Sequence, residues 1–294
     1  MNALVTGGTG FIGSRLVSKL VDRGIAVTCI ARSSIQNKSV KTIRGDLTYA
    51  DIPITQEKFD VVYHLAAASP MEKDKKILKS VNYDGVVNLF NLVKDKTKFF
   101  IYVSGLGVFG DAKGIVDEKT PLKPHTEYTK IRLDAQRYLE SECKERSIPF
   151  TVAYLGEVYG NGGWFKGIMV DRIKKGKFRL PKGGEYYRSF VHVDDVVSAL
   201  ITLIEKDAHN ESFIVTDSKP VLFKEFVNFV CDELGVKHPG GVPVFLAKAV
   251  LGGDFVKLLT TSIQTSNAKI AKHYELAYPT YQKGVKEVIS EMKQ

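Results

Sequence analysis

Three glycines near the start of the chain, Gly7, Gly10 and Gly13, constrain its fold more than any other feature. They follow a short apolar run at residues 3–5, which predicts a strand buried on both faces, and they open an amphipathic stretch at residues 11–21. In this context Gly7 allows a tight turn, Gly10 lets the backbone approach a pyrophosphate, and Gly13 lets the helix pack closely on the strand. The helix N-terminus attracts the phosphate charge. The pattern predicts a dinucleotide-binding turn; the alternative is a tight turn that binds no ligand.

Short apolar strands alternate with helices along the first half of the chain. Strands are predicted at residues 3–5, 26–31, 40–44, 61–67, 99–103 and 150–155, and residues 213–216 are expected to return to the same sheet. Helices are predicted at residues 11–21, 74–93, 127–146, 164–175, 223–234, 243–251 and 284–292. A further helix is predicted to follow residues 188–195 and to end near residue 205. This alternation predicts an α/β fold, a doubly wound parallel Rossmann sheet with a small, mainly helical C-terminal lobe.

The predicted sheet divides the chain into two parts. Residues 1–155 are expected to form the Rossmann dinucleotide-binding domain, completed by residues from about 189 to 216. Residues 156–188 and 217–294 are expected to form a substrate-binding lobe. A chain of 294 residues can bury a sizeable core with this organisation.

Charge and cysteine content narrow the classes of partner. The net charge of +9 favours anionic small molecules, and the basic residues are spread along the chain without a recognised RNA motif, so a nucleic acid partner is not expected. Cys29, Cys143 and Cys231 are widely spaced and predict neither a disulfide framework nor a metal site. No signal peptide is visible and no apolar stretch reaches transmembrane length, so we expect a cytoplasmic protein without a membrane partner.

The end of the second predicted strand bears on the choice of cofactor. NAD-preferring sites usually place Asp or Glu there, to hold the ribose 2′-hydroxyl. This strand ends instead in Arg32, Ser33 and Ser34, whose guanidinium and hydroxyls suit a 2′-phosphate. NADP(H) is therefore favoured and NAD(H) stays possible; the alternative is a solvated arginine without a ligand.

The chain resembles the extended short-chain dehydrogenase/reductase family of nucleotide-sugar epimerases, dehydratases and related reductases. The resemblance runs nearly end to end and is carried by residues 6–13, 45–47, 64–67, 81–82, 108–110, 128, 158–160 and 188–195. It implies that Asp46 and Leu47 flank the adenine and that residues 65–67 line the cofactor. The predicted cofactor-binding residues are Gly7, Gly10, Phe11, Ile12, Gly13, Arg32, Ser33, Asp46, Leu47, Leu65, Ala66, Ala67, Asn82, Tyr128 and Arg132.

The predicted catalytic residues are Tyr128 and Arg132, and they depart from the family pattern. The family has Tyr-x-x-x-Lys, where the tyrosine exchanges a proton with the substrate oxygen and the lysine lowers the tyrosine pKa and holds the nicotinamide ribose. Here arginine replaces the lysine, which keeps a positive charge near Tyr128 in a bulkier, planar group. The family's substrate-orienting hydroxyl falls on Gly105. Ser104 is adjacent and is a candidate substrate-binding residue, although strand alternation points it the other way.

Arg188 is the second candidate substrate-binding residue. It matches the arginine that family members place on the pyrophosphate of a nucleoside diphosphate sugar, and a bidentate guanidinium suits that group. The alternative is a surface arginine beside a strand. The resemblance also implies a homodimer that contacts through the helix of Tyr128.

Two functions from different classes remain open. The first is an NADP(H)-dependent oxidoreductase or epimerase that acts on a carbonyl or secondary alcohol, such as a sugar nucleotide, with Tyr128 as general acid/base. The second is a non-catalytic sensor or scaffold that binds NADP(H) through a degenerate site, which Gly105 and Arg132 favour. RNA binding is suggested only by the positive charge.

Overall fold

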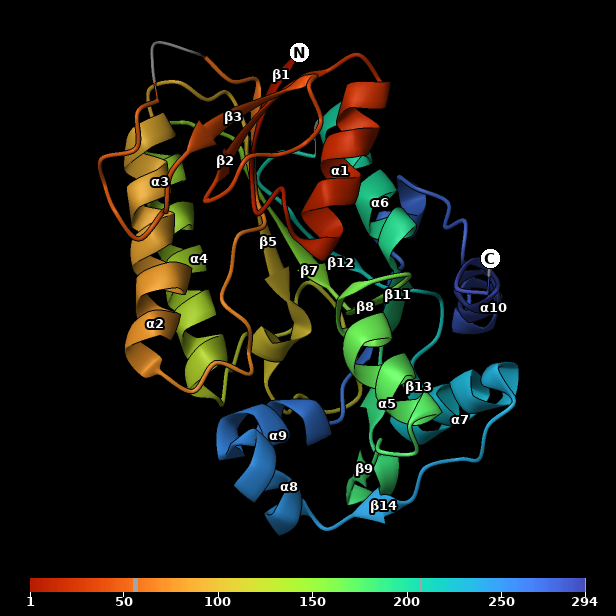
Figure 1. The fold of residues 1–294 in the computed structure, drawn as a ribbon. Helices are drawn as coiled ribbons and strands as arrows, with labels where there is room; N and C mark the ends of the chain where they lie inside the picture. Colours follow the sequence, from red (N-terminus) through yellow and green to blue (C-terminus); the bar gives the residue numbers. More distant parts are fainter. Residues whose placement is uncertain (55–57, 207, 294) are drawn as a thin grey trace. The chain divides into compact units, whose positions relative to one another are not determined.

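A seven-stranded sheet organises the computed structural model, which describes residues 1–54, 58–206 and 208–293 (Figure 1). The strand order is β12-β7-β5-β4-β1-β2-β3. The strands are β1 (Asn2–Thr6), β2 (Ala26–Ala31), β3 (Val40–Arg44), β4 (Val61–His64), β5 (Phe100–Gly105), β7 (Phe150–Leu155) and β12 (Ser212–Val215). β1 pairs in parallel with β2 and β4, and the β2–β3 and β4–β5 pairs are also parallel. The predicted α/β Rossmann fold is confirmed.

The strands are apolar because helices cover both faces of the sheet. Every residue of β4 and β7 is buried, as expected for parallel strands without a solvent-facing side. In Figure 1, α1 (Phe11–Asp22) lies on one side of the sheet, and α2 (Lys75–Lys79), α3 (Gly85–Val93) and α4 (Glu127–Glu145) lie on the other. The helix predicted over residues 74–93 contains a π-helical turn, Ser80–Asp84, between α2 and α3.

The chain forms two compact units. The first contains residues 1–104, 127–154 and 200–213, and the second contains residues 105–126, 155–199 and 214–294. The predicted domain boundaries stay a prediction. The remaining helices are α5 (Asp171–Lys174), α6 (Val193–Glu205), α7 (Phe223–Leu234), α8 (Val244–Leu251), α9 (Gly253–Thr260) and α10 (Tyr281–Glu291). Of these, α9 was not predicted.

The second unit is built from short strand pairs around an aromatic core. The pairs are β8 (Glu157–Tyr159) with β11 (Phe190–His192), β9 (Leu180–Pro181) with β14 (Gly241–Val242), β10 (Tyr187–Arg188) with β13 (Val221–Leu222), and β6 (Ile115–Val116) with β15 (Gln264–Thr265). In the core, the rings of Phe190 and Phe226 stack with centroids 3.8 Å apart, and Tyr159 packs edge-on against both. This packing fixes β11, which carries the motif at residues 188–195.

Candidate functional site

The glycine turn joins β1 to α1 as the sequence predicts. Gly7 has φ +73°, and a side chain on it would place Cβ 2.8 Å from the backbone nitrogen of Ala66. A Cβ on Gly13 would overlap the Gly7 carbonyl oxygen, while the Gly10 N–H donates to that same oxygen at 2.9 Å. Gly10 is the N-cap of α1 and has no side chain that could accept from the first N–H groups of the helix. This turn fits a pyrophosphate at the start of α1.

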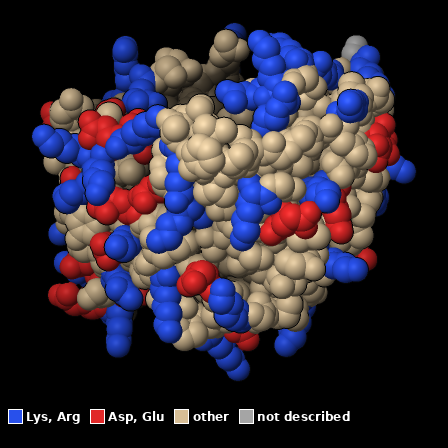
Figure 2. All heavy atoms as spheres, turned by 90° about the horizontal axis from the view of Figure 1, so that it is seen from below, with Lys and Arg blue, Asp and Glu red and all other residues tan. Residues whose placement is uncertain are grey.

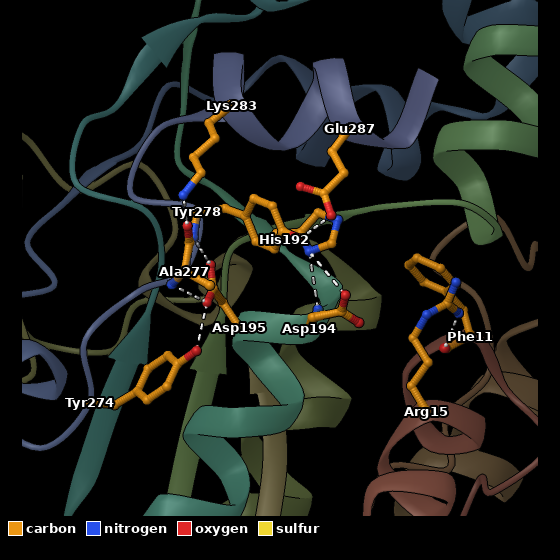
Figure 3. Close-up of polar contacts among 10 residues, drawn as sticks. All are labelled: Phe11, Arg15, His192, Asp194, Asp195, Tyr274, Ala277, Tyr278, Lys283 and Glu287. Carbon is orange, nitrogen blue, oxygen red and sulfur yellow. Dashed lines mark hydrogen bonds and ion pairs between the residues drawn. The ribbon is translucent and has the colours of Figure 1, made fainter. Parts of the chain in front are cut away.

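Phe11, the first residue of α1, is fixed by Arg15 one turn later. The Arg15 guanidinium donates to the Phe11 carbonyl at 3.1 Å and lies 4.6 Å from the centroid of the Phe11 ring (Figure 3). Ile12 follows on the same turn and, like Phe11, is partly exposed. Both residues keep side-chain surface available beside the glycine turn.

The segment after β4 passes directly beside Gly7. Strand pairing ends at His64, three residues before the end of the predicted strand, and the Leu65 N–H donates instead to the Thr6 carbonyl at 3.2 Å. The buried side chain of Asn82 accepts from the Ala68 N–H at 2.8 Å. Leu65, Ala66 and Ala67 therefore leave the sheet at the edge where the glycine turn lies.

Asp46 and Leu47 form the turn that follows β3. The Asp46 carboxylate accepts from the Thr48 N–H at 3.0 Å and from the Thr48 hydroxyl at 2.9 Å. The Leu47 carbonyl accepts from the Asn88 amide on α3 at 2.8 Å. These contacts hold the turn in place at the carboxyl end of its strand.

The predicted cofactor residues that follow β1, β2, β3 and β4 share one edge of the sheet. Arg32 and Ser33 are exposed and follow β2 directly. The other groups follow β1, β3 and β4, and these four strands are neighbours in the sheet. In open parallel sheets, ligands bind outside the carboxyl ends of the strands. The structure thus brings these candidates to one edge.

Tyr128 and Arg132 lie one turn apart on α4, so their side chains share a face of the helix. Tyr128 is half-buried, whereas Arg132 is only 5% exposed. One terminal nitrogen of Arg132, Nη2, donates to the Val103 carbonyl, and the guanidinium carbon lies 4.6 Å from the centroid of the Tyr102 ring. The other, Nη1, is buried and has no hydrogen-bond partner among the described residues. A buried donor of this kind suits a ligand hydroxyl.

Arg132 also sets the electrostatics of its surroundings. Burial, together with the positive charge of Arg132, lowers the pKa of His64 to about 3, so the imidazole is neutral. Burial is also the main cause that raises the pKa of Tyr102 to about 12; Arg132 acts against this rise and Tyr128 adds to it. The charge of Arg132 therefore acts on two buried side chains of the sheet.

Ser104 lies on the face of β5 that α4 covers. Residues two apart on a strand share a face, and the Tyr102 hydroxyl donates to the Arg132 carbonyl on α4 at 3.2 Å. The Ser104 hydroxyl is buried and lacks a partner in the described part of the chain. Ser104 and Arg132 thus each keep one unpaired polar atom.

Arg188 belongs to the second unit and is buried rather than solvated. It forms an ion pair with Glu157, and its Nη1 donates to the carbonyls of Leu258 and Thr261, both at 3.2 Å. Burial lowers the pKa of Arg188 to about 10. The sequence analysis missed Glu157, although β8 and β11 place it opposite Phe190, two residues from Arg188.

The last residue of this motif, Asp195, holds the C-terminal segment of the second unit. Figure 3 shows its buried carboxylate accepting hydrogen bonds from the Tyr274 hydroxyl, the Ala277 N–H and the Tyr278 N–H, at 2.7, 2.8 and 2.9 Å. The His192 ring packs against the Tyr278 ring, with centroids 4.0 Å apart. These contacts assign Asp195 to the architecture of the unit.

Surface charge, possible metal ligands and helix hydropathy add three observations. On the face seen in Figure 2, Lys and Arg side chains are interspersed with Asp and Glu and do not form one continuous basic stripe. Across the described ranges, no three His, Cys, Asp or Glu residues are grouped as metal ligands, and no helix has the length and hydropathy to cross a bilayer.

Comparison with known proteins links this arrangement to one family. Residues 3–216 match the model of the NAD dependent epimerase/dehydratase family. The chain is 26% identical to a 4-hydroxy-2-methyl-3-oxo-4-farnesyl-3,4-dihydroquinoline-1-oxide ketoreductase of Stigmatella aurantiaca, over 92% of this chain and 85% of that protein.

Two solved structures share the fold. A UDP-glucose 4-epimerase of Thermotoga maritima, solved with UDP-glucose, has a TM-score of 0.84 at 23% identity, covering 100% of this chain and 99% of its own. A human epimerase family protein solved with NADPH has a TM-score of 0.82 at 19% identity, covering 99% of each chain. At these identities the likeness concerns the fold alone.

Proposed function

Because the chain belongs to the NAD dependent epimerase/dehydratase family, we propose that it is an NADP(H)-dependent oxidoreductase or epimerase acting on a carbonyl or secondary alcohol. The observation that carries this proposal is the pair Tyr128 and Arg132 on one face of α4, with Arg132 buried and its Nη1 unpaired within the described chain. A phenol beside a fixed positive charge is the arrangement that general acid/base chemistry at an oxygen requires.

The residues around the glycine turn fit a nicotinamide dinucleotide. The turn is open above Gly10, where a Cβ would meet only the Gly7 carbonyl oxygen, 3.1 Å away, among the described atoms. Structural neighbours were solved with NADPH or with NAD, which supports this class of cofactor. Such a group supplies or accepts a hydride when it is bound. Arg32 and Ser33 would hold the 2′-phosphate of NADP(H), and Arg132 Nη1 would bind a ribose hydroxyl.

Tyr128 would exchange a proton with the substrate oxygen. Arg132 lies one helical turn from Tyr128 on the same face of α4, so the two side chains can act on the same substrate and cofactor. Ser104 has a buried, unpaired hydroxyl on the α4 face of β5, and it would supply the polar contact to the substrate that Gly105 lacks.

A nucleoside diphosphate sugar is the substrate class that we propose. Neighbours were solved with UDP-glucose or UDP-glucuronic acid, which supports it. Arg188 would contact the diphosphate through its Nε, which has no partner among the described residues, or by exchanging Glu157 or the two carbonyls that it now binds. Replacing Glu157 by Gln removes the competing charge, so Glu157→Gln should bind UDP more tightly and Arg188→Ala more weakly. Undetectable UDP binding in both proteins and in the wild type would favour a smaller carbonyl substrate.

The alternative is a non-catalytic NADP(H)-binding sensor or scaffold. Gly105 and Arg132, which depart from the family pattern, favour this alternative. The two functions differ in one measurable property, because only the enzyme oxidises NADPH in the presence of a carbonyl compound.

The experiment is a screen of sugar nucleotides, keto-sugars and small ketones for NADPH oxidation, followed by Tyr128→Phe. Loss of general acid/base help should lower the rate about 10²–10⁴-fold while NADPH affinity stays nearly unchanged. Tyr138→Phe is the matched control, because Tyr138 lies on the same helix and packs against Phe90 and Tyr83. If the folded protein binds NADPH but no compound in the screen leads to NADPH oxidation, the proposed enzymatic activity is contradicted. That result would support the sensor or scaffold.

A further inference from the structure

A row of buried polar side chains crosses the sheet below the predicted reaction site. Thr6, His64 and Tyr102 are direct neighbours on β1, β4 and β5, so all three project from the same face of the sheet. Thr6 and His64 share a hydrogen bond of 2.8 Å, and the His64 and Tyr102 rings lie nearly parallel, 11° apart, with centroids separated by 5.8 Å. All three residues are fully buried.

The row ends at Arg132 on α4, which makes three contacts with Tyr102 and Val103 of β5. Its guanidinium covers the Tyr102 ring, its Nη2 binds the carbonyl of Val103, and its own carbonyl accepts the Tyr102 hydroxyl. Tyr102 therefore contacts both ends of the same residue. A rotation of the guanidinium would lose the aromatic contact and the Val103 hydrogen bond together.

The aromatic contact favours arginine over lysine at this position. A guanidinium is planar and weakly hydrated, so it stacks on a ring, while its remaining nitrogen stays available for a ligand. An ammonium is a compact, strongly hydrated point charge with one nitrogen, so it cannot bind the Val103 carbonyl and cover the ring as a planar guanidinium does. The surroundings of Arg132 thus fit arginine itself.

We propose that Tyr102 is a positioning residue, which holds the Arg132 guanidinium so that Nη1 serves the cofactor and the charge lies beside Tyr128. The proposal rests on the function proposed above. The ring of Tyr102 then matches the arginine that replaces the family's lysine, and restoring that lysine lowers activity.

The test compares three substitutions with a matched control. Tyr102→Leu removes the ring and should lower both kcat and NADPH affinity about tenfold, the scale of a desolvated cation–π contact. Tyr102→Phe keeps the ring and should restore most of both. Arg132→Lys should lower kcat to a similar degree, and Tyr102→Leu combined with it should add little. Tyr63→Leu is the control, because Tyr63 is equally buried on β4 but projects from the opposite face.

Rescue by an aromatic ring separates positioning from simple loss of packing. If Tyr102 places the Arg132 guanidinium, Tyr102→Phe should restore the kcat and NADPH affinity that Tyr102→Leu loses, and Tyr63→Leu should leave both unchanged. Equal effects of Tyr102→Leu and Tyr63→Leu, or a rise in activity with Arg132→Lys, would overturn the proposal. If the wild type binds NADPH but oxidises none, the proposed function fails, and NADPH titration of the same variants decides the positioning role alone.

Discussion

The Tyr274 hydroxyl donates a 2.7 Å hydrogen bond to the carboxylate of Asp195, which is fully buried at the start of α6. The backbone N–H groups of Ala277 and Tyr278 also donate hydrogen bonds to this carboxylate. A charged acceptor bound to three donors is among the stronger polar arrangements in a protein interior. The Asp195 carboxylate therefore attaches three residues of the segment at 274–278 to α6.

Asp195→Ala should weaken the second unit. The change leaves three donors without their acceptor, and we expect the free energy of unfolding to fall by about 3 kcal/mol. Urea denaturation measures this difference. Asp194→Ala is the control, because the neighbouring side chain is 58% exposed, and it should cost far less. Equal losses for the two variants would contradict the importance of the Asp195 contacts.

The cofactor preference depends on Arg32, which is exposed at the carboxyl end of β2. Arg32→Ala should weaken NADPH binding about tenfold or more and leave NADH binding nearly unchanged, because only NADPH carries the 2′-phosphate. Fluorescence titration with both cofactors measures the preference. Lys58→Ala, on the amino side of β4, should change neither affinity. Equal NADPH and NADH affinities in the wild type would speak against the assignment.

Gly13 should tolerate no side chain. A Cβ there overlaps the Gly7 carbonyl oxygen, so Gly13→Ala must displace either α1 or the glycine turn. We expect NADPH binding to be lost and the thermal midpoint to fall by several degrees. Gly167→Ala has open space around its Cβ and should keep both properties. Calorimetry with and without NADPH distinguishes the outcomes, and unchanged cofactor affinity in Gly13→Ala would contradict close packing at the turn.

Asp217 should make stability fall as the pH rises. Burial raises the pKa of this carboxyl to about 8, and the nearby charge of Asp195 adds to the rise. The folded state therefore holds a proton between about pH 4 and pH 8 that the unfolded state releases, so unfolding becomes easier across this range. Asp217→Asn should be more stable than the wild type at pH 8.5 and similar to it at pH 5. Denaturation at the two pH values tests this, with exposed Asp171→Asn as the control; an equal pH slope in the wild type and Asp217→Asn would contradict the shift.

The glycine turn and most strands of the sheet could be predicted from local patterns. Gly7, Gly10 and Gly13 signal a turn by spacing alone, and the strand at residues 150–155 is a continuous apolar run. The contact of Tyr102 with Arg132 could not be predicted, because it depends on strand register and on the rotation of α4. The ion pair of Glu157 with Arg188 was missed for the same reason, since β8 and β11 are separated by many residues in the chain.

The predicted end of the strand at residues 61–67 was wrong because contacts with the glycine turn replace strand pairing after His64. Residues 65–67 are apolar enough to extend β4, but the turn at Gly7 draws the backbone of Leu65 and Ala66 toward Thr6. Local hydropathy does not show whether residues 65–67 continue the strand or turn toward Thr6. The helix at residues 253–260 was missed because Gly252 precedes it and Gly253 is its first residue, and a pair of glycines is typical of a loop.

Because β6 pairs with β15, this strand pair can form only after most of the chain has been synthesised. At about 5–20 residues per second, the roughly 150 residues between these strands take about 8–30 s to emerge from a ribosome. β1, β2, β3 and β4 are all made before β6 and need no later strand to pair with one another. Leu258 and Thr261, whose carbonyls bind Arg188, come late in the chain. A nascent chain therefore holds its glycine turn well before the surroundings of Arg188 have left the ribosome.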